Sequence, residues 1–389
     1  MTTEGGFLRA ARASLGWSQG QAAAELAALA TQRGINVAAP SSLKTQLSRW
    51  ENQHVIPEET YRILLCELYG RTDEELGLVP QAPADEPDEA ELLRTELAVA
   101  AAVDDAAIDL LDAQLAATSA LDGRLGSAAV AGSVRAQLSH LERVLTHAIS
   151  PDPRRRLGRL VGAASMLAGQ VANDRSLPAS AWRHFERAKQ VSHDAGDALL
   201  ISWAMVEQSQ LLAGIGREPA ALELIQQAQD LSRSDTSPVL RAWFAANRGD
   251  TLASAGLADQ ARSAYLVAEQ QLAGRPLRVD LGYPGAMCLE FDLAALYRHR
   301  GHGLHTLHDD EEAIADLKHA LSIGGGSARD VAAVHVDLAL AFSATDDPSS
   351  AQTHTRTARE LTSRIGSTRL TTLLDKGSIA RATPAATPS

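Results

Sequence analysis

The side chains best placed for chemistry lie in the segment 41–52, where basic and hydroxyl residues share one side of an expected helix. Leu43, Leu47 and Trp50 follow the i, i+4, i+7 spacing of a buried helical stripe. The polar residues that point away from this stripe or flank it are Lys44, Thr45, Ser48 and Arg49. Because Arg and Lys can donate hydrogen bonds to guanine, such a helix could read bases in the major groove of DNA. The alternative is a solvated helix face without a partner.

A second candidate is a run of histidines spaced three residues apart, namely His299, His302, His305 and His308. A helix turns about 100° per residue, so this spacing spreads the rings over half of the helix circumference. At most two neighbours, such as His302 and His305, could share one metal ion, and the run contains no acidic residue. Polar lining of a groove is therefore favoured over a zinc site.

The sequence offers no set of residues typical of catalysis. It contains no glycine-rich phosphate loop, no serine, histidine and aspartate in the order of a hydrolase triad, and no evident pair of catalytic carboxylates. Gly324, Gly325 and Gly326 follow an expected helix and precede Ser327, which suits the start of the next helix. This pattern indicates a turn between helices rather than a nucleotide site. We therefore expect neither an enzyme nor a cofactor nor a bound metal.

Residues 1–78 predict five short helices, which would hold the polar helix in place. Their starts are marked by capping side chains or by a helix-initiating proline: Ser18 with Gln21, Ser41 or Ser42, Pro57, and Thr72 with Glu75. The order of motifs over residues 6–78 resembles the XRE (phage-repressor-like) helix-turn-helix family. The motifs are Arg9 and Arg12, then Trp17-Ser18-Gln19, then Leu47-Ser48-Arg49-Trp50-Glu51-Asn52. The resemblance implies that Lys44, Thr45 and Arg49 face bases and that Gln19 and Asn52 hold phosphates.

Two features of this region differ from the family pattern. The usual short turn between the second and third helices is replaced by the longer stretch 27–40, and the segment after Asn52 carries Glu58 and Glu59 where basic phosphate contacts are common. Residues 1–71 contain seven basic and six acidic side chains, so one domain alone would bind DNA weakly. A homodimer on two half-sites of double-stranded DNA would compensate for this weakness.

From residue 154 to residue 366 the sequence repeats itself. Alanines with a larger residue four positions on and a second alanine seven positions on begin five units, at Ala181, Ala221, Ala261, Ala313 and Ala351. A small residue precedes each of them by twelve positions: Gly169, Ser209, Gly249, Gly301 and Ala339. The pattern resembles the tetratricopeptide (TPR) repeat, a helical hairpin of about 34 residues, although the units here are longer. We expect about five hairpins stacked as one α-solenoid.

A TPR-like array binds partners in a concave groove lined by the first helix of each hairpin. The residues that the repeat places there are Gln170, Asn173, Trp203, Gln210, Trp243, Asp250, Arg298, His302 and His305. Trp203 and Trp243 occupy equivalent positions one repeat apart, and two indoles beside amide groups would suit a peptide or a small ligand. The alternative is that both indoles pack between hairpins.

The formal net charge of the 389 residues is −12, and it is unevenly distributed. The segment 72–109 contains twelve acidic residues and one basic residue, Arg94, whereas the flanking regions are nearly neutral. The charge therefore argues against a protein that coats nucleic acid over its whole surface, but not against a local DNA site. Within this segment the acidic, proline-rich residues 79–87 predict a linker, which would repel the DNA backbone or serve as an extended spacer.

The remaining boundaries and the compartment follow from composition. Residues 88–153 predict a helical connector that could dimerise, and residues 367–389 predict a C-terminal tail. Two cysteines far apart exclude a disulfide framework, and no apolar run approaches the ~18–20 residues that span a bilayer. No leader sequence is evident, so we expect a cytoplasmic protein without a membrane partner.

The sequence thus predicts an all-α protein, with a five-helix helix-turn-helix domain followed by a TPR-like α-solenoid of helical hairpins. This layout resembles that of bacterial XRE–TPR regulators. The resemblance implies a sequence-specific DNA-binding transcriptional regulator whose solenoid senses a peptide, a small ligand or a protein partner. The alternative is a protein–protein interaction adaptor whose helix-turn-helix domain is degenerate, a hypothesis that Glu58 and Glu59 favour.

Overall fold

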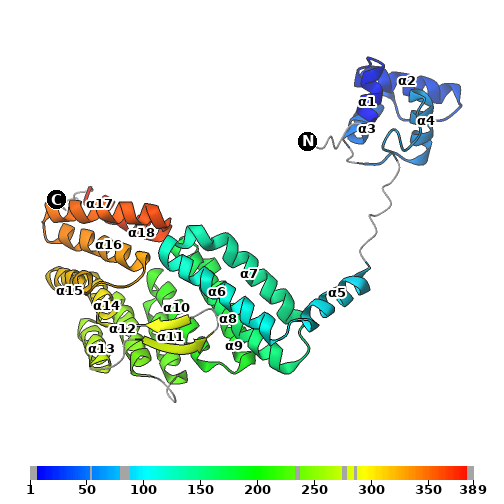
Figure 1. The fold of residues 1–389 in the computed structure, drawn as a ribbon. Helices are drawn as coiled ribbons and strands as arrows, with labels where there is room; N and C mark the ends of the chain where they lie inside the picture. The colour runs from blue at the N-terminus through cyan, green and yellow to red at the C-terminus, as the bar shows by residue number, and fades with distance from the viewer. Residues whose placement is uncertain are drawn as a thin grey trace. The chain divides into compact units, whose positions relative to one another are not determined.

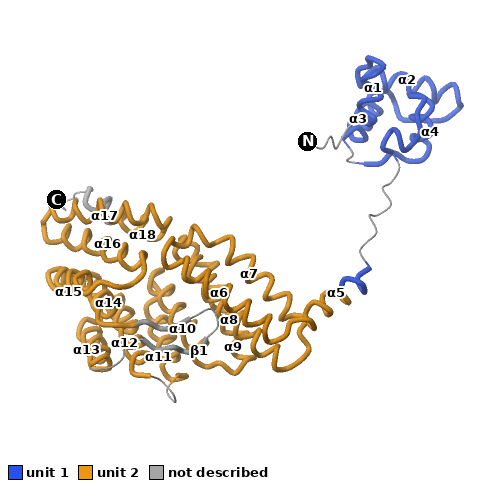
Figure 2. The backbone as a smooth tube through the Cα atoms, in the orientation of Figure 1, with its two compact units in different colours: residues 1–92 blue, residues 93–389 orange. Residues whose placement is uncertain are grey.

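The computed structural model describes residues 7–52, 55–78, 88–232, 237–273, 278–283 and 287–382. Within these residues the chain forms eighteen helices and one small antiparallel β-hairpin, which confirms the predicted all-α class (Figure 1). The chain divides into two compact units, residues 1–92 and residues 93–389, coloured separately in Figure 2. The predicted linker 79–87 lies outside the described residues.

Unit 1 is built from four complete helices: α1 (Phe7–Ser14), α2 (Gln19–Gln32), α3 (Pro40–Glu51) and α4 (Glu59–Tyr69). The predicted capping box at the start of α2 is confirmed, because Gln21 N–H donates to Ser18 Oγ at 3.2 Å and Ser18 N–H donates to Gln21 Oε1 at 2.8 Å. Thr72 and Glu75 form the same reciprocal pair. They cap a single turn rather than the predicted fifth helix, because Gly77, with a φ of +65°, ends it.

The long connection between α2 and α3 is part of the core of unit 1. Its residues Ile35, Val37 and Ala38 pack, partly buried, against the buried leucines of the helices. The backbone N–H of Ala38 also donates to the Tyr61 hydroxyl at 3.4 Å. The connection that is longer than in the family pattern is therefore held by apolar packing, and this packing positions the start of α3.

Unit 2 begins with the connector and continues as five helical hairpins. The end of α5 (Glu89–Ala101), which crosses the boundary between the units, is followed by α6 (Asp105–Leu125) and α7 (Ser127–His147). The hairpins are α8 (Pro151–Asp174) with α9 (Pro178–Ala195), α10 (Ala198–Gly214) with α11 (Glu218–Leu231), α12 (Pro238–Ser254) with α13 (Ala258–Leu272), α14 (Leu293–Thr306) with α15 (Asp310–Ile323), and α16 (Ala328–Ala344) with α17 (Pro348–Ile365). Each hairpin packs on the next, as in a solenoid (Figure 1).

The small residues of the repeat are explained by the packing inside each hairpin. A Cβ atom at Gly169 would overlap the Phe185 ring, and a Cβ at Gly249 would overlap the Tyr265 ring. At Gly301, a Cβ would lie 2.6 Å from Leu317 Cγ. The large residue of the second helix thus fills the space that the small residue of the first helix leaves open. The β-hairpin of β1 (Arg278–Tyr283) and β2 (Met287–Glu290) is inserted between α13 and α14 and lengthens that unit.

The end of the chain corrects one expectation. Residues 368–382, predicted to be part of a tail, form helix α18 (Thr368–Ala382), which buries Leu370 and Leu374. Helix α18 packs against α8, α16 and α17, and α16 and α17 also contact α6. The last helices of unit 2 therefore meet its first helices, and the solenoid closes on itself. No helix in the described part of the chain combines the length and apolar character that crossing a membrane requires.

Candidate nucleic-acid interface and solenoid interior

Helix α3 presents the polar face that the sequence predicted. Lys44, Thr45 and Arg49 are exposed, and Ser48 is half-buried beside them. The opposite side of α3 is buried in the core of unit 1 and consists of Leu43, Leu47 and Trp50. The predicted division of this helix into an apolar stripe and a polar face is therefore present in the structure.

The cations of this face differ from most other cations of unit 1 in having no partner. Four arginines pair with carboxylates of the unit: Arg9 and Arg12 with Glu51, Arg33 with Glu67, and Arg62 with Asp73. Neither Lys44 nor Arg49 has an ion pair or a side-chain hydrogen bond among the residues that the structure describes. Their charges are available to a ligand that brings phosphate oxygens or base acceptors.

Helix α3 is oriented by a buried carboxylate at its end. Glu51 accepts hydrogen bonds from Arg12 Nε at 2.5 Å and Nη2 at 3.0 Å, and from Gln19 Nε2 at 2.8 Å. We call these three residues the Glu51 cluster. Arg12 also donates to the Trp17 carbonyl at 2.7 Å, and its hydrogen bond with Glu51 raises its pKa. The cluster joins α1, α2 and α3, so it fixes the direction in which the polar face points.

The two predicted phosphate contacts already have partners within unit 1. Gln19 belongs to the Glu51 cluster through its side-chain amide. Asn52 accepts a hydrogen bond from Arg9 Nη2 at 2.5 Å and donates to the Ser48 carbonyl at 2.7 Å. Asn52 remains exposed beside the polar face, whereas Gln19 is half-buried. Their contact with phosphate stays a prediction, and the structure adds a positioning role for Gln19.

The two tryptophans predicted to line a groove pack against each other. Trp203 and Trp243 are each only 8% exposed, and their ring centroids lie 5.4 Å apart. Trp243 also contacts the Phe244 ring, at 5.1 Å between centroids. This is the packing arrangement that the sequence left open as the alternative. The indoles therefore form part of the junction between α10 and α12.

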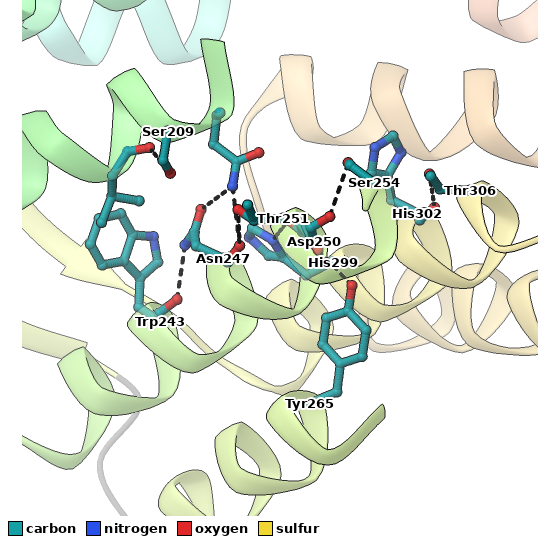
Figure 3. A network of polar contacts seen from close by, with 12 residues as sticks. Ser209, Trp243, Asn247, Asp250, Thr251, Ser254, Tyr265, His299, His302 and Thr306 are labelled. Atoms are coloured by element: carbon teal, nitrogen blue, oxygen red, sulfur yellow. Dashed lines mark hydrogen bonds and ion pairs between the residues drawn. The ribbon is translucent and has the colours of Figure 1, made fainter. Parts of the chain in front are cut away.

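Two of the polar residues predicted beside them, Gln210 and Asp250, take part in a network of polar contacts on α10, α12 and α14, which Figure 3 shows in part. Asp250 accepts hydrogen bonds from the Tyr265 hydroxyl at 2.9 Å and contacts His299 Nδ1 at 2.6 Å. One repeat earlier, Gln210 donates to the side chain of Asn247 at 3.3 Å. The network links the first helices of three hairpins, so these polar side chains stabilise the stacking of the repeats.

The remaining predicted groove residues also make contacts within the solenoid. Gln170 donates to Glu207 at 3.0 Å, and Arg298 lies 3.8 Å from Asp330. Asn173 is half-buried on α8. All nine predicted groove residues thus lie on the first helices of the hairpins, but the sequence did not show that most of them contact neighbouring helices.

Three histidines of the predicted run have aspartate partners from outside the run. His299 pairs with Asp250, His302 lies 3.1 Å from Asp337, and His305 lies 2.5 Å from Asp310. The Asp337 carboxylate raises the pKa of His302 to about 9. Among the described residues, no group of three or more His, Cys, Asp or Glu side chains is arranged to hold a metal ion.

Unit 2 contains contacts between distant parts of the chain that the sequence did not predict. Arg329 Nη2 donates to both carboxylate oxygens of Asp122 at 2.9 Å and to Ser127 Oγ at 2.7 Å, and its Nε lies 3.4 Å from Asp174 Oδ2. Ser367 Oγ donates to Asp174 at 2.6 Å. We call these five residues the closure cluster, because they join α16 and the start of α18 to α6–α8. No local pattern signals it, since its members lie about 200 residues apart.

The role of Glu51 was also missed, although the Ser-Arg-Trp-Glu motif that contains it was recognised. Its burial next to two basic residues depends on the packing of α1 against α3, which the motif alone does not reveal. Neither a protein-family model nor a curated protein matches the chain. The function is therefore inferred from the geometry of the site.

Proposed function

We propose that the protein is a sequence-specific DNA-binding transcriptional regulator, with α3 as the helix that reads DNA and the solenoid as the part that senses a ligand. One observation carries this proposal. Among the described residues, Lys44 and Arg49 are exposed and unpaired on a helix that the Glu51 cluster joins to α1 and α2, whereas four other arginines of unit 1 are paired. A preorganised helix with free donors is what recognition in the major groove requires.

The proposed contacts divide into base reading and positioning. Arg49 and Lys44 would donate to guanine O6 and N7, and Thr45 would contact a neighbouring base. Asn52 would bind phosphate and set the register of α3 on the DNA. Because residues 1–71 carry almost no net charge, a single unit would bind weakly. We therefore propose a homodimer that binds two half-sites.

The solenoid would act by a change in population between two arrangements. A ligand that binds one arrangement more tightly than the other shifts the equilibrium by its difference in affinity. In a homodimer this shift would alter the spacing of the two DNA-binding units and thus the affinity for the operator. Such a regulator would act in the cytoplasm.

A gel shift at several salt concentrations tests the proposal. The probe is the DNA upstream of the protein's own coding sequence, and the proteins are wild type, Arg49→Ala and Lys44→Ala. We expect each substitution to weaken binding ~5- to 150-fold, which corresponds to the ~1–3 kcal/mol of a specific base contact. Arg71→Ala is the matched control, because Arg71 is exposed on unit 1 outside α3. It should change affinity much less.

An adaptor without DNA binding is the competing function. Glu58 lines the same surface hollow as Arg49 and Tyr61, so a carboxylate lies near the polar face of α3. A carboxylate at this position would repel phosphate. If Arg49→Ala and Lys44→Ala bind DNA as tightly as the wild type, α3 does not read DNA and the adaptor becomes the better account.

A further inference from the structure

The interior of the closed solenoid contains a cation that forms no direct ion pair. Arg369 lies in the first turn of α18, and its Nε is buried without a hydrogen-bond partner. Its guanidinium forms no ion pair or hydrogen bond with the residues that the structure describes. The other arginine of this region, Arg329, forms ion pairs with Asp122 and Asp174 and donates a hydrogen bond to Ser127, although its Nε also lacks a hydrogen-bond partner. Arg369 therefore has no carboxylate within ion-pair distance, although the charges of Asp174, Asp337 and Glu207 act on it.

A carboxyl group faces Arg369 without reaching it. Glu207 on α10 accepts hydrogen bonds from the Gln170 amide at 3.0 Å and from the Trp203 side chain. No cation lies within ion-pair distance of Glu207 in the described part of the chain, although the charges of Arg329 and Arg369 act on it. Burial raises the pKa of Glu207 and lowers the pKa of Arg369. Burial is the largest cause of both shifts.

Solvent nevertheless reaches this interior. His302 on α14 has a side chain that is 50% exposed. The charges of Asp337, Asp250 and Arg369, which lie on three other helices, nevertheless act on the pKa of His302. A half-exposed side chain on which these charges act lies next to a water-accessible space. A small molecule could therefore replace water between these helices.

The contacts around Arg369 show what kind of molecule would be held. Ser367, two residues earlier, bonds to Asp174, and the packing of α18 against α8 depends on this region. Arg369 thus lies where the two ends of the solenoid meet. An anion bound to it would contact the last helix and the first hairpin at once, and it would supply the direct ion pair that Arg369 lacks.

We propose that the interior of the solenoid is a binding site for a small ligand that carries a carboxylate or phosphate group, and that the guanidinium of Arg369 binds this group. Glu207 limits the affinity for such ligands, because its charge opposes that of the ligand. The proposal specifies the ligand class for the sensing role proposed above. Binding of such a ligand would also stabilise the closed form of unit 2.

The test measures anion binding without DNA. Inorganic phosphate and acetate are titrated into the full chain against chloride at equal ionic strength, with calorimetry and tryptophan fluorescence as readouts, because Trp203 bonds to Glu207. We expect saturable binding of at least one anion. The affinity should fall at least tenfold in Arg369→Ala and less in Arg369→Lys. Arg356→Ala, which removes an exposed arginine from α17, is the matched control and should bind like the wild type.

A second variant keeps the proposal testable if Arg369→Ala fails to fold. Glu207→Gln removes the opposing charge and should tighten anion binding several-fold, with circular dichroism confirming the helical fold. A preference for phosphate assigns a phosphorylated ligand, and a preference for acetate assigns a carboxylic acid. The proposal is overturned if neither anion binds above chloride, if Arg369→Ala binds like the wild type, or if Glu207→Gln weakens binding. None of these results bears on DNA binding, which the gel shift tests separately.

Discussion

Each unit of the protein contains a buried ionic cluster, and the two clusters join very different parts of the chain. In unit 1, Glu51 bonds to Gln19 and Arg12, which precede it by 32 and 39 residues. In unit 2, Arg329 bonds to Asp122, 207 residues earlier. The Glu51 cluster orients helices within one small bundle. The closure cluster instead joins the two ends of an array whose other contacts are mostly between neighbouring hairpins.

The Glu51 cluster and the closure cluster differ in what their buried charges do for the fold. In a repeat array, stability is close to a sum of terms for each repeat and its neighbours, so the hairpins do not need the closure to fold. We therefore expect that the ends of unit 2 can separate while the middle stays intact. We expect no such freedom in unit 1, because the cluster that stabilises it also orients α3. We expect unit 1 to behave as a rigid reader and unit 2 as the part that changes state.

The largest effect should follow from loss of the carboxylate in unit 1. Glu51→Ala leaves the Arg12 guanidinium without its counter-ion in a site where the Glu51 side chain is fully buried. Breaking a buried pair in this way costs about 3–5 kcal/mol. We expect faster amide exchange throughout α1–α3 and loss of DNA binding. Glu67→Ala is the control, because the exposed pair with Arg33 should contribute only ~0–1 kcal/mol.

A smaller and more local effect should follow from opening the closure. Arg329→Ala leaves Asp122 and Asp174 buried without their cation, and we expect a cost of about 3 kcal/mol, at the low end for buried pairs because Arg329 is partly exposed. Hydrogen exchange should increase in α6 and α16–α18 and remain slow in α10–α13. Uniformly faster exchange would show that the solenoid unfolds as one block, and the contrast with unit 1 would then be wrong.

A neutral substitution sharpens the same comparison. Gly126, between α6 and α7, has a φ of +86°, and a Cβ there would overlap the Ile365 carbonyl at the end of α17. Gly126→Ala should therefore open the closure without changing any charge. The pattern of exchange should match that of Arg329→Ala. Gly132→Ala, at a helical position where a Cβ meets nothing within 4 Å, is the control and should leave exchange unchanged.

The smallest effect concerns pH. Asp337 raises the pKa of His302 to about 9, above the value of about 6.5 expected in the unfolded chain. This pair contributes its full stability below about pH 6.5 and loses it as the pH rises through about 9. Asp250 and Arg369 also act on His302, and the ring is half exposed, so the change should be small. The melting temperature of unit 2 should fall over this interval, and His302→Gln should reduce the fall.

The features that were predictable from the sequence are those with a local period. The stripe of Leu43, Leu47 and Trp50 follows from helical spacing, and it is buried as expected. The capping box at Ser18 follows from two residues three positions apart. The small residues of the repeat, such as Gly249, were recognised from their spacing, and Gly249 packs under the Tyr265 ring of the next helix. In each case the partners lie within one helix or one hairpin.

The features that were missed depend on packing between distant segments. The burial of Leu370 and Leu374 in helix α18 becomes evident only when α8 and α16 are placed beside it. Arg369 looks like any surface arginine in the sequence. Its lack of a partner is a property of the closed solenoid, so only the tertiary structure could reveal it. The burial of both indoles likewise depends on how α10 meets α12.

The most direct test of the central claim is a selection of DNA fragments from a random pool by the full-length protein. Three proteins are compared: wild type, the double variant Lys44→Ala with Arg49→Ala, and the control Arg71→Ala. We predict that the wild type and the control enrich one common sequence with two half-sites, whereas the double variant retains only weak binding that is lost at high salt. Enrichment of the same sequence with the same affinity by the double variant, or of no sequence by the wild type, would contradict the claim that α3 reads DNA.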